Sequence, residues 1–264
     1  MKKLLSLLLA LVMLFSLAAC TASGKDDDDK DETEKTEQSD SEKDAEKADE
    51  QEPELDLDKD LVRYAESYAD FIRADPDMDT ATFMKLTSPA LNHQDLTELL
   101  GFFYGIGAYS EEQFLTDMKV TQAQETLRDA YADDFTVTTK VTDAVPYTDD
   151  ELESLRSDVA SIAEGYAKGA ADADGATEAD WADMAAQDGV SVETEKRAYE
   201  LLRLIAEELA DAEITEAYKL TIRNTFEASN LDEPSERVGS IVVVRVNGTW
   251  MLLDGLAAYS MISY

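Results

Sequence analysis

The apolar and polar residues of the chain change their pattern near Asp60. Beyond that point several runs place an apolar residue at every third or fourth position, which is the spacing of one face of an amphipathic helix. Later runs alternate with a period of two, which is typical of strands. The predicted helices cover about 60–75, 80–86, 95–104, 111–132, 148–168 and 192–211, with a short helix around Trp181.

The helix over 148–168 has the best-marked start. Thr148 and Glu151 form a capping box, in which each side chain accepts a hydrogen bond from the backbone N–H of the other residue. The segment near 169–190 is rich in Ala, Asp and Gly and has weak apolar periodicity. We therefore expect a mobile insertion between two strong helices.

Three segments are predicted to be strands. Residues 135–142 and 218–227 alternate between apolar and polar side chains, so each strand should have one buried and one exposed face. Residues 240–246 are almost continuously β-branched, which favours an interior strand covered on both sides. Asn247-Gly248 follows, and this dipeptide is the strongest short signal for a two-residue hairpin turn.

The two-residue turn sets the register of the closing hairpin. Arg245 then faces Trp250, either in simple rim packing or in a cation-π contact. Val244 faces Met251, and Val242 faces Leu253. The predicted core face therefore comprises Val242, Val244, Met251 and Leu253.

Residues 1–19 have the composition of a secretory leader. Two lysines precede an apolar run that is too short to span a bilayer, and a hydrophilic segment follows it. Leu17-Ala18-Ala19-Cys20 resembles the lipobox of bacterial lipoproteins. The resemblance implies cleavage before Cys20 and attachment of diacylglycerol to the Cys20 sulfur, and further acylation would anchor the chain stably. The alternative is an ordinary leader or signal anchor that ends in Cys.

Residues 20–58 are predicted to be a disordered acidic linker between the lipidated Cys20 and the domain. Positions 21–58 hold 18 acidic and 5 basic residues and no aromatic residue, so they cannot bury enough apolar surface to become ordered. Together with the lipobox, this predicts a protein at the extracytoplasmic face of the cell membrane, held there by its lipid anchor and not by a spanning helix.

The formal charge of the chain is −36, from 59 acidic and 23 basic residues. Proteins bind nucleic acid largely by neutralising phosphates with Lys and Arg. A charge this negative repels polyanions, so nucleic-acid partners are excluded.

Helices that come first and antiparallel strands that close on a hairpin predict an α+β fold. We expect helices packed on one face of a three- to four-stranded antiparallel sheet, within a domain covering residues 59–264. Ile214–Gly255, with its valine run before Asn247-Gly248-Thr249-Trp250, resembles the closing strands of lipoprotein domains similar to the nuclear-transport-factor-two-like and cystatin-like folds. Such folds include enzymes, binding modules and domains of unknown role, so the resemblance implies no particular activity.

The sequence has no nucleophile-elbow motif, and one His and one Cys are too few for a zinc site. His93 is either an acid/base partner of Asp95 or Glu98 or an ordinary surface residue before a helix. Residues 172–175 resemble the start of a calcium loop, but the Gly comes too early. We expect no cofactor and no metal ion.

An aromatic cluster is the one candidate for a ligand pocket. Phe102, Phe103, Tyr104 and Tyr109 lie among three glycines, where a helix end can border an apolar cleft. The alternative is that these side chains fill the core between the helices and the sheet.

The absence of a catalytic motif favours a non-enzymatic module that binds a ligand or an extracytoplasmic protein. The alternative is a small-molecule enzyme with a buried carboxylate in a cone-shaped cleft, which requires a carboxyl group of raised pKa in an apolar pocket. The binding component of a transporter is disfavoured, because the chain is short and lacks repeated β-α alternation.

Overall fold

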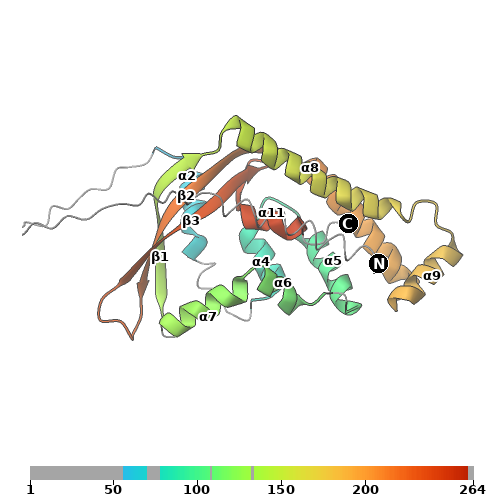
Figure 1. Cartoon of the computed structure of the whole chain (residues 1–264), viewed down its shortest axis with the longest axis horizontal. Coiled ribbons are helices and arrows are strands. Elements are labelled where there is room, and N and C mark those ends of the chain that lie inside the picture. The colour runs from blue at the N-terminus through green and yellow to red at the C-terminus, as the bar shows by residue number, and fades with distance from the viewer. Residues whose placement is uncertain (1–55, 70–77, 108, 132–133, 261–264) are drawn as a thin grey trace, which may run out of the picture. The chain divides into compact units, whose positions relative to one another are not determined.

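The computed structural model of the chain describes residues 56–69, 78–107, 109–131 and 134–260 (Figure 1). The leader, the lipobox and the predicted linker as far as residue 55 lie outside the described residues, as does the end of the first predicted helix. The described residues from Asp56 onward belong to one compact unit.

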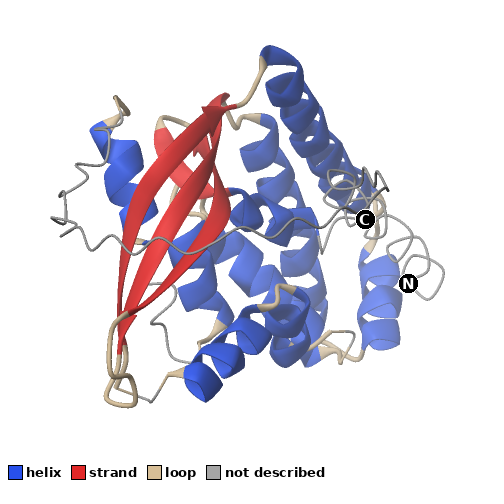
Figure 2. Cartoon of the chain, turned by 60° about the vertical axis from the view of Figure 1, so that its left-hand side comes forward, coloured by secondary structure: helices blue, strands red, loops and turns tan. Residues whose placement is uncertain are grey.

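Four antiparallel strands form one open sheet in the order β1-β2-β3-β4 (Figure 2). Among the described residues, helix accounts for most of the remaining structure, which confirms the α+β class. The strands are β1 Thr136–Pro146, β2 Ile214–Glu227, β3 Ser235–Val246 and β4 Thr249–Leu252.

The register of the closing hairpin is confirmed for its first three pairs. Arg245 pairs with Trp250 and Val244 with Met251, and both turn residues, Asn247 and Gly248, have positive φ. The predicted pair of Val242 with Leu253 is wrong. The ladder ends one pair earlier, because Leu253 begins a helix in place of continuing the strand.

The larger core lies between one end of the sheet and a group of helices. From the sheet it takes Ala217, Val244 and Met251, which are paired across β2, β3 and β4. The helices that contribute to it are α4 Thr80–Thr87, α5 His93–Gly105, α6 Glu111–Asp117, α7 Val120–Ala130, α8 Asp149–Ala171, α10 Val192–Ala210 and α11 Leu253–Ser260.

A second core lies on the opposite face of the sheet, against α2 Lys59–Glu66. Leu61 and Ala65 of this helix pack with sheet residues that include Val243 and Leu252. Figure 2 shows the sheet between this short helix and the larger helical group. The single-face packing predicted for the helices thus applies to the larger core, while α2 covers the other side. At Val243 and Val244, interior strand β3 is therefore buried on both faces, as its valine run predicts. Earlier in the predicted strand Ser240 is exposed and Val242 is only partly buried, so the assignment of Val242 to the core face is wrong.

The first residues of the domain lie before the predicted boundary at 59. Asp58 caps α2, since its Oδ1 accepts a hydrogen bond from the N–H of Asp60 at 2.9 Å. Leu57 packs against the second core. The end of the predicted linker therefore belongs to the folded unit.

Two expectations about the helices have different outcomes. The capping box of Thr148 and Glu151 is present, and α8 continues to Ala171. The single helix over 111–132 is wrong, because Lys119 has a φ of 59° and separates α6 from α7. Helix α9, Glu178–Asp188, is the short helix expected around Trp181, while the mobility of 169–190 stays a prediction.

Candidate functional site

The aromatic cluster at the end of α5 lies on the border of the larger core. Phe102 and Phe103 contact each other edge to face at 5.6 Å, and Tyr104 stacks on Tyr109 at 6.3 Å. All four side chains are half-buried and pack against core residues. Tyr109 donates a hydrogen bond to Asp117, and burial raises the pKa of Tyr104 to about 12. These contacts favour core packing, and ligand binding at the cluster stays a prediction.

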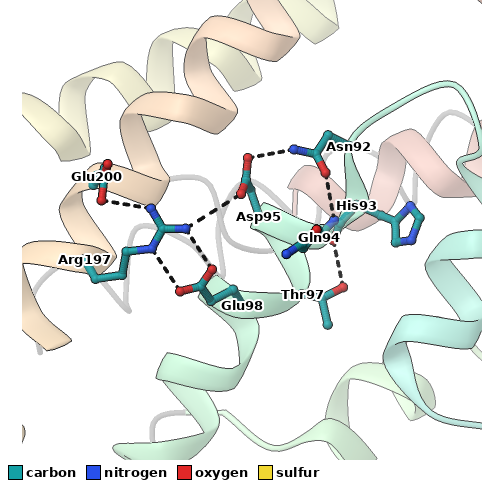
Figure 3. Close-up of polar contacts among 8 residues, drawn as sticks. All are labelled: Asn92, His93, Gln94, Asp95, Thr97, Glu98, Arg197 and Glu200. Carbon is teal, nitrogen blue, oxygen red and sulfur yellow. Dashed lines mark hydrogen bonds and ion pairs between the residues drawn. The ribbon is translucent and has the colours of Figure 1, made fainter.

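The structure does not bring His93 together with an acidic partner. His93 begins α5, and its side chain points away from Asp95 (Figure 3). Asp95 instead accepts a hydrogen bond from the Asn92 side chain at 2.9 Å and lies 4.0 Å from Arg197. Glu98 also faces Arg197. The acid/base pair considered from the sequence is therefore not formed.

Arg197 of α10 is the centre of a charged network that joins α10 to α5 (Figure 3). Its Nε and Nη2 donate to the two carboxylate oxygens of Glu98, each at 2.9 Å, and its Nη1 donates to Glu200 at 2.8 Å. The hydrogen bond from Arg197 lowers the pKa of Glu98. Since both carboxylates are engaged by one guanidinium, this network positions helices and offers no free base.

A surface groove of about 570 Å³ runs between α8 and α10. The antiparallel packing of these helices explains it, because small side chains on both facing surfaces leave the space open. The lining residues are Ala160, Ala163, Glu164, Ala167, Ala170, Ala171, Asp174, Arg203, Ala206, Glu207 and Ala210.

The charged residues of the groove are mainly acidic. Asp174 is paired with Arg203 at 3.2 Å, which leaves Glu164 and Glu207 as the further charged groups of the lining. The groove thus combines an apolar floor with an acidic rim. None of the four aromatic residues predicted as a ligand site lines it. The sequence signal for it was the spacing of Ala160, Ala163 and Ala167 on α8.

Glu195 of α10 is a buried carboxyl group that the sequence prediction missed. Its side chain is 2% exposed, and its Oε2 is buried without a hydrogen-bond partner. Burial and the neighbouring Asp188 raise the pKa of Glu195 to about 7. The available signal was the position of Glu195 in the apolar stripe that continues with Ala198 and Leu202. Glu195 does not line the α8–α10 groove.

A second set of buried polar groups joins the end of α10 to α11 and the start of α5. The backbone N–H of Asn92 donates to Glu208, and Tyr166 donates to the backbone carbonyl of Tyr259 at 2.7 Å. Burial raises the pKa of Glu208 and of Tyr259. These contacts connect α10 with the start of α5 and α8 with α11.

Within the described part of the chain, no three His, Cys, Asp or Glu side chains are placed so that they could hold a metal ion. The helices of this same part are also too short or too polar to cross a membrane. Comparison of the chain with known protein families, with curated proteins and with solved structures finds no match.

Proposed function

We propose that this chain is a lipoprotein anchored to the extracytoplasmic face of the cell membrane. The lipobox Leu17-Ala18-Ala19-Cys20 supports the proposal, because its Cys follows a basic start and an apolar run of leader length. The acidic segment that follows Cys20 would hold the domain away from the anionic membrane surface, since like charges repel.

Replacement of the anchoring sulfur tests this part of the proposal. Cys20→Ala should leave the leader uncleaved or release the protein from the membrane fraction, and mass spectrometry should show the loss of the acyl chains. Ser23→Ala, three residues beyond Cys20, is the matched control. This variant should keep its acyl chains and stay in the membrane fraction. If the Cys20→Ala protein kept the acyl chains and the membrane location of the wild type, the proposed lipid attachment at Cys20 would be wrong.

We further propose that the domain is a non-enzymatic module that binds a partner protein in the α8–α10 groove. The groove itself carries this proposal, since it combines an alanine floor with an acidic rim. Small side chains let another helix approach closely, and Glu164 and Glu207 favour an occupant with Lys or Arg beside its apolar residues. The proposed partner is thus a helical segment with a basic flank, presented by an extracytoplasmic protein.

A bulky residue on the groove floor tests the binding proposal. Ala167 is exposed and lines the groove, so Ala167→Trp should fill it without disturbing the core. Ser161→Trp is the control, because Ser161 is exposed on the same helix but does not line the groove. Crosslinking in intact cells should capture a partner with the wild-type chain and with Ser161→Trp, and lose it with Ala167→Trp. Equal capture of the partner by both variants would contradict the proposal that the partner binds in the groove.

Glu195 is an observation in favour of the alternative function, a small-molecule enzyme. It supplies a buried carboxyl with a pKa of about 7, as that function requires. The position of Glu195 argues against an enzyme, since Glu195 does not line the α8–α10 groove. Native mass spectrometry of the wild-type protein distinguishes the two, because a retained small molecule that is chemically altered on incubation would favour the enzyme.

A further inference from the structure

We propose that the free edge of β3 pairs with the same edge of a second copy of the chain, in an antiparallel register centred on Val238. The free edge is defined as residues 235–242, which among the described residues pair with β2 on one side only. β4 covers the other side of β3 only at 243–246, because the chain leaves the sheet at Leu253 to form α11. This surface is separate from the α8–α10 groove, and the pairing does not depend on the lipid anchor.

The register of the closing hairpin gives the direction of the main-chain groups along the free edge. Val246 and Thr249 flank the two-residue turn, so they form a hydrogen-bonded pair. Such pairs recur at every second residue, and Glu236, Val238 and Ser240 therefore direct their N–H and C=O groups to the side of β3 that β4 leaves open. Within the described ranges, no turn or loop bonds to these groups. They present a row of donors and acceptors to a further strand.

The charged side chains of the free edge are directed toward β2. The Arg237 guanidinium lies 5.8 Å from the ring centre of Phe226, a β2 residue. The Glu236 carboxylate lies 3.9 Å from Nε of Arg223, also on β2. The remaining residues of the edge, 238–242, carry no charge. The side on which a further strand would pair is thus clear of charged groups.

The opposite edge of the sheet, β1, is blocked against such pairing. A bulge interrupts its ladder between Val141 and Asp143. The N–H of Ala144 donates to the Asp143 carboxylate at 2.9 Å, and Pro146 has no N–H. Bulges, charges and Pro are the usual protection of edge strands, whereas 235–242 pairs with β2 without a bulge. Pairing through β3 alone stops at two copies, because β1 cannot extend the sheet further.

A second copy fits the free edge because the edge is complementary to itself. The register centred on Val238 places this residue opposite its counterpart. Arg237 then faces Gly239 of the second copy, and Glu236 faces Ser240, so no two charged residues are directly opposite. Val238 is 68% exposed, the most exposed large apolar side chain of the described part, and its counterpart would cover it. Figure 1 shows the connection between β2 and β3 projecting beyond α7, which leaves this end of the sheet accessible.

The net charge of the chain sets the salt dependence of the pairing. The formal charge is −36, so two copies repel each other at a distance. Salt screens exposed charges beyond about 8–10 Å, while main-chain hydrogen bonds depend little on salt. The dissociation constant of the dimer should therefore fall as the salt concentration rises.

Analytical ultracentrifugation of the full chain in detergent, with micelles in excess over protein, measures the association. The wild-type chain should form dimers that dissociate on dilution. Ser240→Pro removes an N–H that points away from β2, so this variant should keep its fold and become monomeric. Ser240→Ala keeps the N–H and should dimerise like the wild type. Circular dichroism checks the fold of both variants, and a monomeric wild-type chain or a dimeric Ser240→Pro would overturn the proposal.

A charge exchange at Val238 tests the register itself. Val238→Lys and Val238→Glu each place like charges opposite each other in the dimer, so each variant alone should lose the dimer. An equimolar mixture of the two should recover it, because Lys then faces Glu. Val145→Lys is the control, since Val145 is 55% exposed on β1, and it should dimerise like the wild type. Dimers of either Val238 variant alone at the wild-type level, or a mixture that stays monomeric, would show that the register is wrong.

Discussion

The closing hairpin and the α8–α10 region differ in what occupies their buried positions. In the hairpin, Val243, Val244 and Met251 are fully buried, and each packs against apolar neighbours on its own face of the sheet. In the α8–α10 region, the carboxyl of Glu195 is almost as deeply buried, and alanines leave a groove open at the surface. The hairpin thus contributes stability, while the helical region holds the groove that is proposed to bind a partner.

This difference has a physical cause in the two types of element. A central strand presents two faces, and β3 has a core on each, so substitution at either face affects buried packing. A long surface helix has one buried stripe and can carry a charged or small residue there when a neighbouring helix end is loosely packed. Polar groups buried without full hydrogen bonding reduce stability, so they are more often found where they serve a function.

The largest effect is expected for Val244→Asp. Val244 has no exposed surface and lies between Ala217 on β2 and Met251 on β4. An unpaired carboxylate there should lower the free energy of unfolding by about 3–5 kcal/mol or more. The total for a typical domain is about 5–15 kcal/mol. Urea unfolding followed by circular dichroism measures the loss.

Thr249→Lys is the control for this comparison, because Thr249 is exposed in the same hairpin. It should change the free energy of unfolding by less than about 0.5 kcal/mol. A folded Val244→Asp protein with wild-type stability would contradict the assignment of the hairpin as the stabilising region.

The sequence predicts the hairpin well because its signals are local. Asn247-Gly248 has the positive φ values of its turn type, and the period of two then assigns each valine to a face. It predicts α8 from Thr148 and Glu151 for the same reason. The sequence does not predict the end of β4, because α11, which begins at Leu253, packs at Gly255 against Thr87 of α4, far away in the chain.

The candidate sites depend on contacts between distant residues, so the sequence indicates them poorly. Glu195 has the periodicity of a core residue, and its position in the stripe does not say which distant element covers its carboxyl group. The α8–α10 groove results from the packing of two helices whose alanine stripes, taken singly, resemble ordinary helix surface. The break at Lys119 also has no local signal, because a left-handed φ is uncommon for Lys.

A smaller effect is expected for Gly255→Ala, which tests how the hairpin joins the helices. A Cβ on Gly255 would lie 2.5 Å from the backbone oxygen of Thr87, at the contact between α11 and α4. Since backbone atoms must shift to make room, the substitution should lower the free energy of unfolding by about 1–3 kcal/mol. Gly239→Ala is the matched control, because a Cβ there meets no atom within 4 Å. The melting temperatures of the two variants provide the comparison, and an equal loss in both would contradict close packing at Gly255.

The smallest effect is expected for Arg197→Met, on the α5–α10 side of the helical region. Its guanidinium joins Glu98 and Glu200, yet its side chain is 39% exposed, so solvent screens the network. The substitution should lower the free energy of unfolding by about 0.5–1 kcal/mol at low salt and by less at high salt. Arg203→Met, which removes a single exposed pair with Asp174, should have almost no effect. Chemical unfolding at two salt concentrations measures both, and a salt-independent loss in Arg197→Met would show that its contribution comes from packing of the side-chain stem and not from charge.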